Sequence, residues 1–371
     1  MTRARRQAWV TSGRIFSEQK VKWAIQSFKP FKSAGKDGIL PPLLQKAPAK
    51  LLLQIRKLFR WSYTLGYVPK AWCGVRVVFI PKAERDPEDP KAYRPISLTS
   101  FLLKALEKLI DSHLRSEHLT RKPLNQTQHA YQQGKSTISA LHKLISKVEN
   151  ALENKEIALV AFLDIEGAFD NTSHSTIREA ALKKGVESET VDRMTHMLSS
   201  RAVSPEMDTS EITVRTTIGC PQGGVLSPLM WCLVMDDLLT LLNQLGYETI
   251  GYADDLAVIV RGKHGSTISD RMQDALNLIS GWCRGEGLNA NPDKTVLIPF
   301  TRRQILNLRT PNLNGIQLSF SKETKYLGVI LDAKLNWKLQ IQRIKEKAIR
   351  SLMACKTLLG RRWGLKPAMV R

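Results

Sequence analysis

The sequence predicts an α+β fold in which an antiparallel sheet is covered by helices on one face. Residues 157–163 form a near-continuous apolar run with the length of a buried strand. Two shorter runs, 247–251 and 256–260, flank a tight turn and predict a hairpin, and a further strand is expected at 295–300. Helical patterns separate these strands, and this order is typical of a split βαβ arrangement.

Helices dominate the expectations for the chain before this sheet. Residues 1–16 are basic and show little periodicity, so we interpret them as a tail or the remnant of an upstream segment. Ser17 is a suitable N-cap for a helix that ends before Pro30, and residues 33–38 have the composition of a loop. We expect a helix at 43–65 with Leu51, Leu52, Ile55, Leu58 and Phe59 buried, a strand at 75–80 stopped by Pro81, a loop at 84–91 and a helix at 100–119.

Further helices are expected between and beyond the strands. Ser136 can cap a helix with an apolar face of Ile138, Leu141, Leu144, Ile145, Val148 and Leu152. We also expect two short helices within 173–200, a strand at 213–218, a glycine loop at 219–224, helices at 228–242 and 267–285, and an edge strand at 326–331. A basic amphipathic helix follows from Leu335. Because its apolar stripe has no partner, we interpret the sequence as a fragment.

The charge balance indicates a globular protein that binds a polyanion. Among 371 residues, 43% are hydrophobic, and 56 Lys and Arg face 34 Asp and Glu, for a formal charge of +22. Nucleic acid is the expected partner, because each neutralised phosphate releases counterions. A membrane surface is the competing explanation, but the basic amphipathic segments also read as core helices. The longest apolar run, near 225–235, falls short of the roughly 20 residues that a span needs.

The N-terminal sequence and the cysteines indicate an intracellular location. Met1 is followed by Arg3, Arg5 and Arg6 without the apolar stretch of a signal peptide. The five cysteines are scattered, without the spacing of a zinc site. We therefore expect reduced thiols, in the cytoplasm or the nucleus, at Cys73, Cys220, Cys232, Cys283 and Cys355.

Three carboxylates form the strongest candidate site. Asp254 and Asp255 lie in the turn of the expected hairpin, and Asp164 ends the buried strand. If that strand lies beside the hairpin, all three converge on one patch, where Mg²⁺ or Mn²⁺ would relieve their repulsion. Three such carboxylates suit two metal ions about 4 Å apart in phosphoryl transfer. The alternative for Asp254 and Asp255 alone is an ordinary turn.

Basic residues and a glycine loop are weaker signals. Lys82, Lys91 and Arg94 flank one loop and could clamp a triphosphate, although a solvated loop rim explains their spacing better. Glycines in the 219–224 loop let the backbone approach a ligand closely. Phe169, taken alone, is more typical of a core residue.

Seven segments stand out in order along the chain. They are 31–39, Tyr93-Arg94-Pro95-Ile96-Ser97-Leu98, 162–170, Gly219-Cys220-Pro221-Gln222-Gly223, Tyr252-Ala253-Asp254-Asp255, 288–294 and Tyr326-Leu327-Gly328. They resemble the motifs of reverse transcriptases, and in particular those of non-LTR (LINE-type) retrotransposons such as the insect jockey and I groups. Together they span roughly residues 31–331, and seven ordered motifs are far more specific than any single one. The Gly35-Lys36-Asp37 segment departs from the more usual proline before the aspartate.

The resemblance implies a right-hand polymerase fold and a role for each matching residue. It implies a basic extension at 1–30, fingers at 31–155, a palm at 156–331 and a partial thumb at 332–371. Asp164, Asp254 and the backbone carbonyl of Ile165 would bind metal, with Asp255 a more peripheral ligand. Lys82, Arg94, Phe169, Gln222 and Lys294 would bind the deoxynucleotide; Phe169 would exclude a 2′-hydroxyl and Lys294 could protonate pyrophosphate. Tyr326, Leu327 and Gly328 would form the primer grip.

The implied activity is RNA-directed DNA polymerisation, in which deoxynucleotides are added to a primer 3′-hydroxyl on an RNA template. An RNA-copying RNA polymerase of the viral type is the alternative among enzymes, but Phe169 and the Tyr-Ala-Asp-Asp form favour deoxynucleotides. An inactive or domesticated remnant that only binds RNA is the alternative among non-enzymes, and the intact aspartates argue against it. Such elements commonly carry an endonuclease upstream and a ribonuclease H or zinc knuckle downstream, for which 371 residues leave no room.

Overall fold

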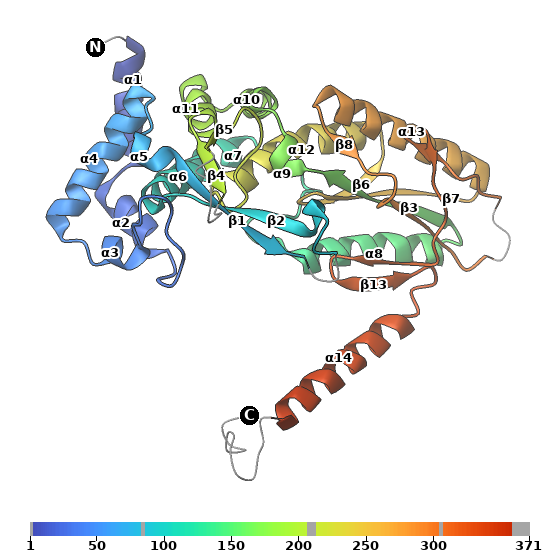
Figure 1. The fold of residues 1–371 in the computed structure, drawn as a ribbon. Coiled ribbons are helices and arrows are strands. Elements are labelled where there is room, and N and C mark those ends of the chain that lie inside the picture. Colours follow the sequence, from blue (N-terminus) through green and yellow to red (C-terminus); the bar gives the residue numbers. More distant parts are fainter. Residues whose placement is uncertain (1–2, 83–85, 206–212, 304–306, 358–371) are drawn as a thin grey trace.

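A five-stranded antiparallel sheet forms the centre of the molecule (Figure 1). The computed structural model describes residues 3–82, 86–205, 213–303 and 307–357. Strand β3 (Ile157–Glu166) pairs with β7 (Asp255–Gly262) along its length, and on its other side with the short strands β8 (Asn289–Ala290) and β9 (Val296–Phe300). β6 (Glu248–Tyr252) forms a hairpin with β7. The expected α+β fold is confirmed, and β3 is the buried strand expected at 157–163.

Both faces of this sheet are covered, so the prediction of helices on one face was wrong. Leu159, Ala161 and Leu163 join the core beneath α12 (Ser227–Gln244) and α13 (Gly265–Gly285). The alternate side chains of β3, from Ala158 to Phe162, pack with α8 (Thr137–Glu153) and with the hairpin of β12 (Glu323–Tyr326) and β13 (Val329–Asp332). A strand that is apolar at every position requires cover on both sides.

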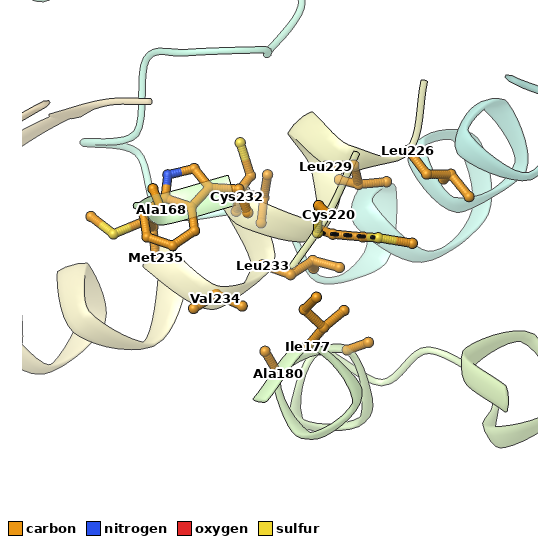
Figure 2. Packing of buried hydrophobic residues seen from close by; sticks show 14 of the residues in the cluster. Ala168, Ile177, Ala180, Cys220, Leu226, Leu229, Cys232, Leu233, Val234 and Met235 are labelled. Carbon is orange, nitrogen blue, oxygen red and sulfur yellow. Dashed lines mark hydrogen bonds between the residues drawn. The ribbon is translucent and has the colours of Figure 1, made fainter. Parts of the chain in front are cut away.

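Helix α12 lies at the middle of the larger core. Its residues are buried on nearly every side, as expected for a helix that is hydrophobic all round. Figure 2 shows it between Ala168 on one side and Ile177 and Ala180 of α10 (His174–Lys183) on another. The Cys220 thiol points back at α12 and lies 3.9 Å from the sulfur of Met230. This packing ties the glycine loop to the central sheet.

A second, mixed sheet flanks the first in the order β2-β1-β4-β5. β1 (Gly74–Pro81) pairs antiparallel with β2 (Tyr93–Leu98) and parallel with β4 (Ala202–Pro205). The strand expected at 213–218 is reduced to β5 (Val214–Arg215), because its exposed side chains have only one short partner. β4 was not predicted, since four residues carry too little periodicity.

The N-terminal segment is helical, and its interpretation as a tail was wrong. α1 (Arg3–Ile15) buries Ala8, Ile15 and the following Phe16 against α4 (Ala49–Leu65). Trp9 lies 4.7 Å from the Trp61 ring, and the Arg60 guanidinium lies 3.8 Å above Trp9. The apolar pattern of α1 is hard to recognise in sequence because buried Thr11 and Ser12 interrupt it.

Other N-terminal helices follow the predictions with local differences. α2 (Glu18–Gln26) is capped by Ser17 as expected, and 33–38 is a loop. The helix expected at 43–65 is split into α3 (Pro41–Gln45) and α4, because Pro48 cannot continue a helix. Ile55 and Phe59 are buried, whereas Leu51 and Leu58 are about half exposed. Ser100 and Ser136 cap α6 (Phe101–His113) and α8, but Ile138 is exposed.

The remaining elements are short connectors or lie near the C-terminal end. They are α5 (Lys70–Cys73), the 3₁₀ turn η1 (Pro90–Ala92), the π turn η2 (Leu114–His118), α7 (Leu119–Arg121), α9 (Ala168–Asn171), α11 (Ser188–Ser199), β10 (Asn312–Leu313), β11 (Ile316–Gln317) and α14 (Lys338–Thr357). In the region of the helix expected at 100–119, α6 is α-helical to His113, and the chain then continues as the π-helix η2 and the short α7. Helices α10 and α11 confirm the pair expected at 173–200.

The strand expected at 326–331 is interrupted by a hairpin turn: Tyr326 ends β12, and residues 329–331 belong to β13. Leu327 and Gly328 have φ angles of +47° and +87° and reverse the chain between β12 and β13. Helix α14 then extends away from the body (Figure 1), and its Ile341, Ile344 and Leu352 are each more than half exposed. These apolar side chains are exposed as far as the described residues extend, and the rest of the expected helix lies outside them.

Membrane spans and cysteines can be compared with the expectations from the sequence. Within the described residues, no helix is both long enough and apolar enough to cross a membrane. All five cysteines are free thiols, as expected.

Candidate active site

The turn between β6 and β7 is held from below by a buried tryptophan. Ala253 has a φ angle of +54°, an uncommon conformation for a residue with a side chain. Its carbonyl accepts a hydrogen bond of 2.7 Å from the indole N–H of Trp231 in α12. This bond fixes the turn where Asp254 projects, so the core helix determines the position of the carboxylate.

Strand pairing brings the predicted aspartates together. Asp164 is the register partner of Asp255 across β3 and β7, and the Ile165 N–H donates to the Asp254 carbonyl at 3.2 Å. Asp164, Ile165 and Asp254 line one cavity of about 700 Å³. Asp255 follows Asp254 directly but does not line this cavity.

The cavity also gathers the predicted nucleotide-binding residues from four separate parts of the chain. Lys82 and Arg94 come from β1–β2, Phe169 from α9, Gln222 from the glycine loop and Lys294 from the segment before β9. Its further lining residues are Tyr93, Pro95, Tyr131, Gly167, Ala168, Asp170, Gly223, Gly224, Ser227 and Pro228. All five predicted side chains therefore face the space in front of Asp164 and Asp254.

Burial and neighbouring negative charge raise the pKa values of Asp254 and Asp255. Burial raises the pKa of Asp254, the Asp164 charge raises it further, and Lys294 and Arg94 oppose the rise. Burial, reinforced by Asp254 and Asp164, raises the pKa of Asp255 to about 6. Both shifts mean that additional positive charge at this position would stabilise the ionised groups.

The oxygen donors fit a hard divalent cation. Two carboxylates that face one cavity are the ligand type that such cations prefer. Within the described residues, no three His, Cys, Asp or Glu side chains are close enough to form a metal site by themselves. The cation-binding set that the cavity offers is therefore Asp164 and Asp254, with Asp255 beside it.

Phe169 and Gln222 are linked through the glycine loop. The Cys220 N–H donates to the Phe169 carbonyl at 2.6 Å, and the Gln222 amide donates to Asp170 at 2.9 Å. Gly219 permits this approach, because a Cβ there would lie 2.5 Å from the Asp170 carbonyl oxygen and its φ is +80°. The Phe169 ring is half-buried with its centroid 6.4 Å from that of Trp231, so one face of α9 packs on the core while the other borders the cavity.

Lys294 contacts the acidic group directly. Its ammonium lies 2.8 Å from Asp164 Oδ2 and 3.9 Å from Glu166 Oε1. The three side chains are 48%, 27% and 39% exposed, which leaves the lysine able to reorient toward a ligand.

The predicted primer-grip residues lie away from the cavity. Tyr326 is buried, with its ring centroid 4.9 Å from that of Phe162, and its hydroxyl has no hydrogen-bond partner among the described residues. Burial raises the pKa of Tyr326, and Asp255 raises it further. Leu327 and Gly328 form the adjacent turn. None of the three lines the cavity.

Sequence reasoning missed several residues of the site. Tyr131 lines the cavity with a φ angle of +56°, and Trp231 anchors the Ala253 turn. Asn291 and Glu166 form hydrogen bonds beside Lys294. Asn291 and Glu166 both fall in segments with motif resemblance (288–294 and 162–170), which was the one available signal. Nothing local distinguishes Tyr131 or Trp231, because their roles depend on residues far away in the sequence.

An antiparallel sheet that presents two carboxylates to a cavity with a basic rim is typical of a polymerase that transfers nucleotides. Comparison with family models identifies the kind of polymerase. The model described as "Reverse transcriptase (RNA-dependent DNA polymerase)" matches residues 80–331, and the chain belongs to this family.

Curated relatives include polymerases of insect mobile elements. The chain is 27% identical over 351 residues to the "Probable RNA-directed DNA polymerase from transposon BS" of Drosophila melanogaster, and 30% identical over 334 residues to the "RNA-directed DNA polymerase from mobile element jockey" of Drosophila funebris. These alignments cover 93% and 88% of this chain, but 39% and 36% of the relatives. The chain thus spans less than half of their length. The resemblance to LINE-type reverse transcriptases is confirmed.

Proposed function

We propose that this chain is an RNA-directed DNA polymerase that extends a primer 3′-hydroxyl with deoxynucleotides on an RNA template. The observation that carries the proposal is the cavity where Asp164 and Asp254 face Lys82, Arg94 and Lys294. Two acids opposite a basic rim match a nucleoside triphosphate that arrives with its divalent cation. Family membership and the names of the relatives support the same activity.

The acidic side of the cavity would hold Mg²⁺ or Mn²⁺. Asp164, Asp254 and the Ile165 carbonyl are the proposed ligands, and Asp255 is a peripheral acid whose pKa, raised to about 6 by burial and by Asp254, favours nearby positive charge. When bound, the cation would activate the attacking hydroxyl and stabilise the leaving oxygen. The half-buried positions of Asp164 and Asp254 keep both carboxylates open to ligand.

The remaining side chains would orient the nucleotide. Lys82 and Arg94 would bind its phosphates, and Gln222, held by Asp170, would contact the sugar or base from the glycine loop. The Phe169 ring would occupy the space that a ribose 2′-hydroxyl requires. Lys294, next to Asp164, would give a proton to the departing pyrophosphate.

We further propose the divisions of a polymerase hand. The fingers would comprise 31–155, preceded by the basic extension at 1–30 that contains α1 and α2, the palm 156–331 and a partial thumb 332–371. Because Tyr326 is buried, a primer contact in this region would come from the Leu327-Gly328 turn, with Tyr326 supporting it from below.

Primer extension with oligo(dT) on poly(rA) tests the proposal. We expect the chain to incorporate dTTP in the presence of Mg²⁺ or Mn²⁺. Incorporation of UTP in place of dTTP would favour an RNA polymerase, and template binding without any extension would favour an RNA-binding remnant. Either result would overturn the proposed activity.

A further inference from the structure

Asn291 is the centre of a hydrogen-bond network beside the acidic cavity. Its side-chain Oδ1 accepts from the backbone N–H groups of Asp293 and Lys294, at 2.9 and 3.3 Å. An Asn that accepts from the backbone two and three residues later closes a tight local turn. This turn begins the segment that presents the Lys294 ammonium.

The same residue ties the turn to β3. The Asn291 backbone N–H donates to the Asp164 carbonyl at 3.1 Å, and its side-chain N–H donates to Glu166 Oε1 at 2.5 Å. Its own carbonyl accepts from the Thr295 hydroxyl at 2.7 Å. Asn291 therefore bonds at once to the strand that carries Asp164 and to the turn that carries Lys294.

Lys294 has two acidic neighbours on that strand. The ammonium lies 2.8 Å from Asp164 and 3.9 Å from Glu166, and all three groups are partly exposed. A cation arriving at Asp164 competes with this ammonium for the same oxygens. Glu166, which is already bonded to Asn291, offers the second position for the lysine.

We propose that Asn291 is a positioning residue that sets the distance between Lys294 and Asp164, and thereby the competition between this lysine and a divalent cation. Glu166 holds Asn291 in place and receives the lysine when a cation occupies Asp164. The catalytic consequence, delivery of a proton from Lys294, rests on the proposed function. The geometric consequence, coupling of Asn291 to cation affinity through Lys294, rests only on the proposed cation site at Asp164 and not on polymerase activity.

A double-mutant cycle on Mn²⁺ affinity tests the coupling without any catalysis. Free Mn²⁺ is measured by electron paramagnetic resonance for the full chain, Asn291→Ala, Lys294→Ala and the double variant. Lys294→Ala is expected to tighten Mn²⁺ binding about two- to fivefold, the range for loss of one partly exposed charge. Asn291→Ala should tighten it by a smaller factor, and should add nothing in the Lys294→Ala background.

Two variants separate positioning from loss of fold. Asn291→Ser keeps a hydroxyl oxygen that can accept from the turn N–H groups, and should restore most of the parent affinity. Asn289→Ala removes the other amide bonded to Glu166, at 3.2 Å, and leaves the Asn291 turn intact, so it should not change the affinity. An Asn291→Ala effect that persists in the Lys294→Ala background, or an equal effect of Asn289→Ala, would overturn the proposal.

The same double-mutant cycle, measured on the rate of single-nucleotide addition, distinguishes a failure of the proposed function from a failure of the positioning role. In an active chain, Asn291→Ala should lower kcat more than it changes KM for the deoxynucleotide, and should cause no further loss without Lys294. If the parent adds no nucleotide while the Mn²⁺ cycle still shows coupling, the proposed function fails and the positioning role stands. If the parent is active and the two substitutions are additive in both measurements, the positioning role fails alone.

Discussion

A substitution of Asp254 can separate the proposed catalysis from the proposed template binding. The Asp254 carboxylate faces the cavity beside Asp164, where burial and that neighbour raise its pKa, whereas template binding would draw on the charge of the whole surface. We expect Asp254→Asn to abolish primer extension and leave template–primer affinity within about twofold, since one amide changes few of the phosphate contacts. Primer extension and filter binding measure the two quantities.

The control for this substitution is Asp270→Asn, which changes an exposed aspartate on α13 that forms an ion pair with Arg309. It should leave both quantities unchanged. Extension by Asp254→Asn at the rate of the parent would remove Asp254 from the proposed cation site.

Under the proposed function, Phe169 discriminates between sugars in addition to packing at the edge of the core. Its ring is half-buried and borders the cavity. We expect Phe169→Ala to raise the ratio of ribonucleotide to deoxynucleotide incorporation at least tenfold. Its stability should fall by less than the roughly 3–5 kcal/mol that a fully buried Phe contributes. Phe79→Ala, at a half-exposed ring on β1, is the matched control and should not change the ratio. An unchanged ratio with a large drop in Tm would make Phe169 a core residue.

Among the site residues, those predicted from the sequence are the ones that neighbouring residues in the chain make recognisable. Asp164 ends a buried apolar run, and Asp254 interrupts a hairpin pattern, so a position can be assigned from neighbours alone. Tyr131 reaches the cavity through a left-handed backbone conformation, and Trp231 acts through a bond to Ala253. Such roles arise from contacts between distant segments, which periodicity does not contain.

The junction between α6 and α12 depends on one buried acid. Glu107 of α6 is 6% exposed, and its carboxylate accepts from the backbone N–H groups of Val225 and Leu226 at 2.7 and 3.5 Å. These bonds hold the start of α12 and the end of the glycine loop. Burial raises the pKa of Glu107, although both N–H groups, Arg201 and Lys104 lower it in part.

This shift predicts a pH-dependent stability. Because the folded-state pKa of Glu107 lies above its unfolded value, its contribution to stability is fully present below the unfolded pKa and is lost as the pH rises through the folded-state pKa. Glu107→Gln removes the ionisation and keeps an acceptor oxygen. We expect its Tm to exceed that of the parent at pH 8 and the difference to vanish near pH 4.

Thermal melts of parent, Glu107→Gln and Glu107→Leu across this pH range make the measurement. Glu107→Leu leaves the two N–H groups without their acceptor, and should be less stable than Glu107→Gln at every pH. A Tm difference between parent and Glu107→Gln that does not vary with pH would show that ionisation of Glu107 does not limit stability.

At the scale of elements, the strongly periodic ones were predictable. Apolar patterns that can be recognised without knowledge of tertiary contacts mark β3, α12, α13 and the β6–β7 hairpin. α1 was missed because its buried face includes Thr11 and Ser12, and the β12–β13 hairpin because Leu327 adopts a conformation that leucine rarely has. The second face of the sheet is covered by α8 and by the β12–β13 hairpin, which is distant in sequence. No local pattern specifies that these elements pack there.

Charge is the property of the whole molecule that bears most directly on nucleic-acid binding. The formal charge of +22 is distributed along the chain, and within the described residues α14 exposes an apolar stripe beside its basic residues. Contacts made by such charge, without a formed groove around the duplex, are mostly with phosphates. Affinity should then depend on the ionic strength more than on the sequence of the template.

We therefore expect template–primer affinity to fall by about 10³ or more between 50 and 200 mM salt, as it does when six or more phosphate contacts are made. Substitution of Lys345, Lys347 and Arg350 in α14 by Gln should reduce the slope of log K against log salt, by about one for each phosphate that the variant no longer neutralises. The matched change of Lys20, Lys22 and Lys46, on and beside the N-terminal helices, alters the net charge equally. If both triple variants reduce the slope by the same amount, overall charge determines binding and α14 has no special part in it; a reduction confined to the first places the nucleic acid along α14.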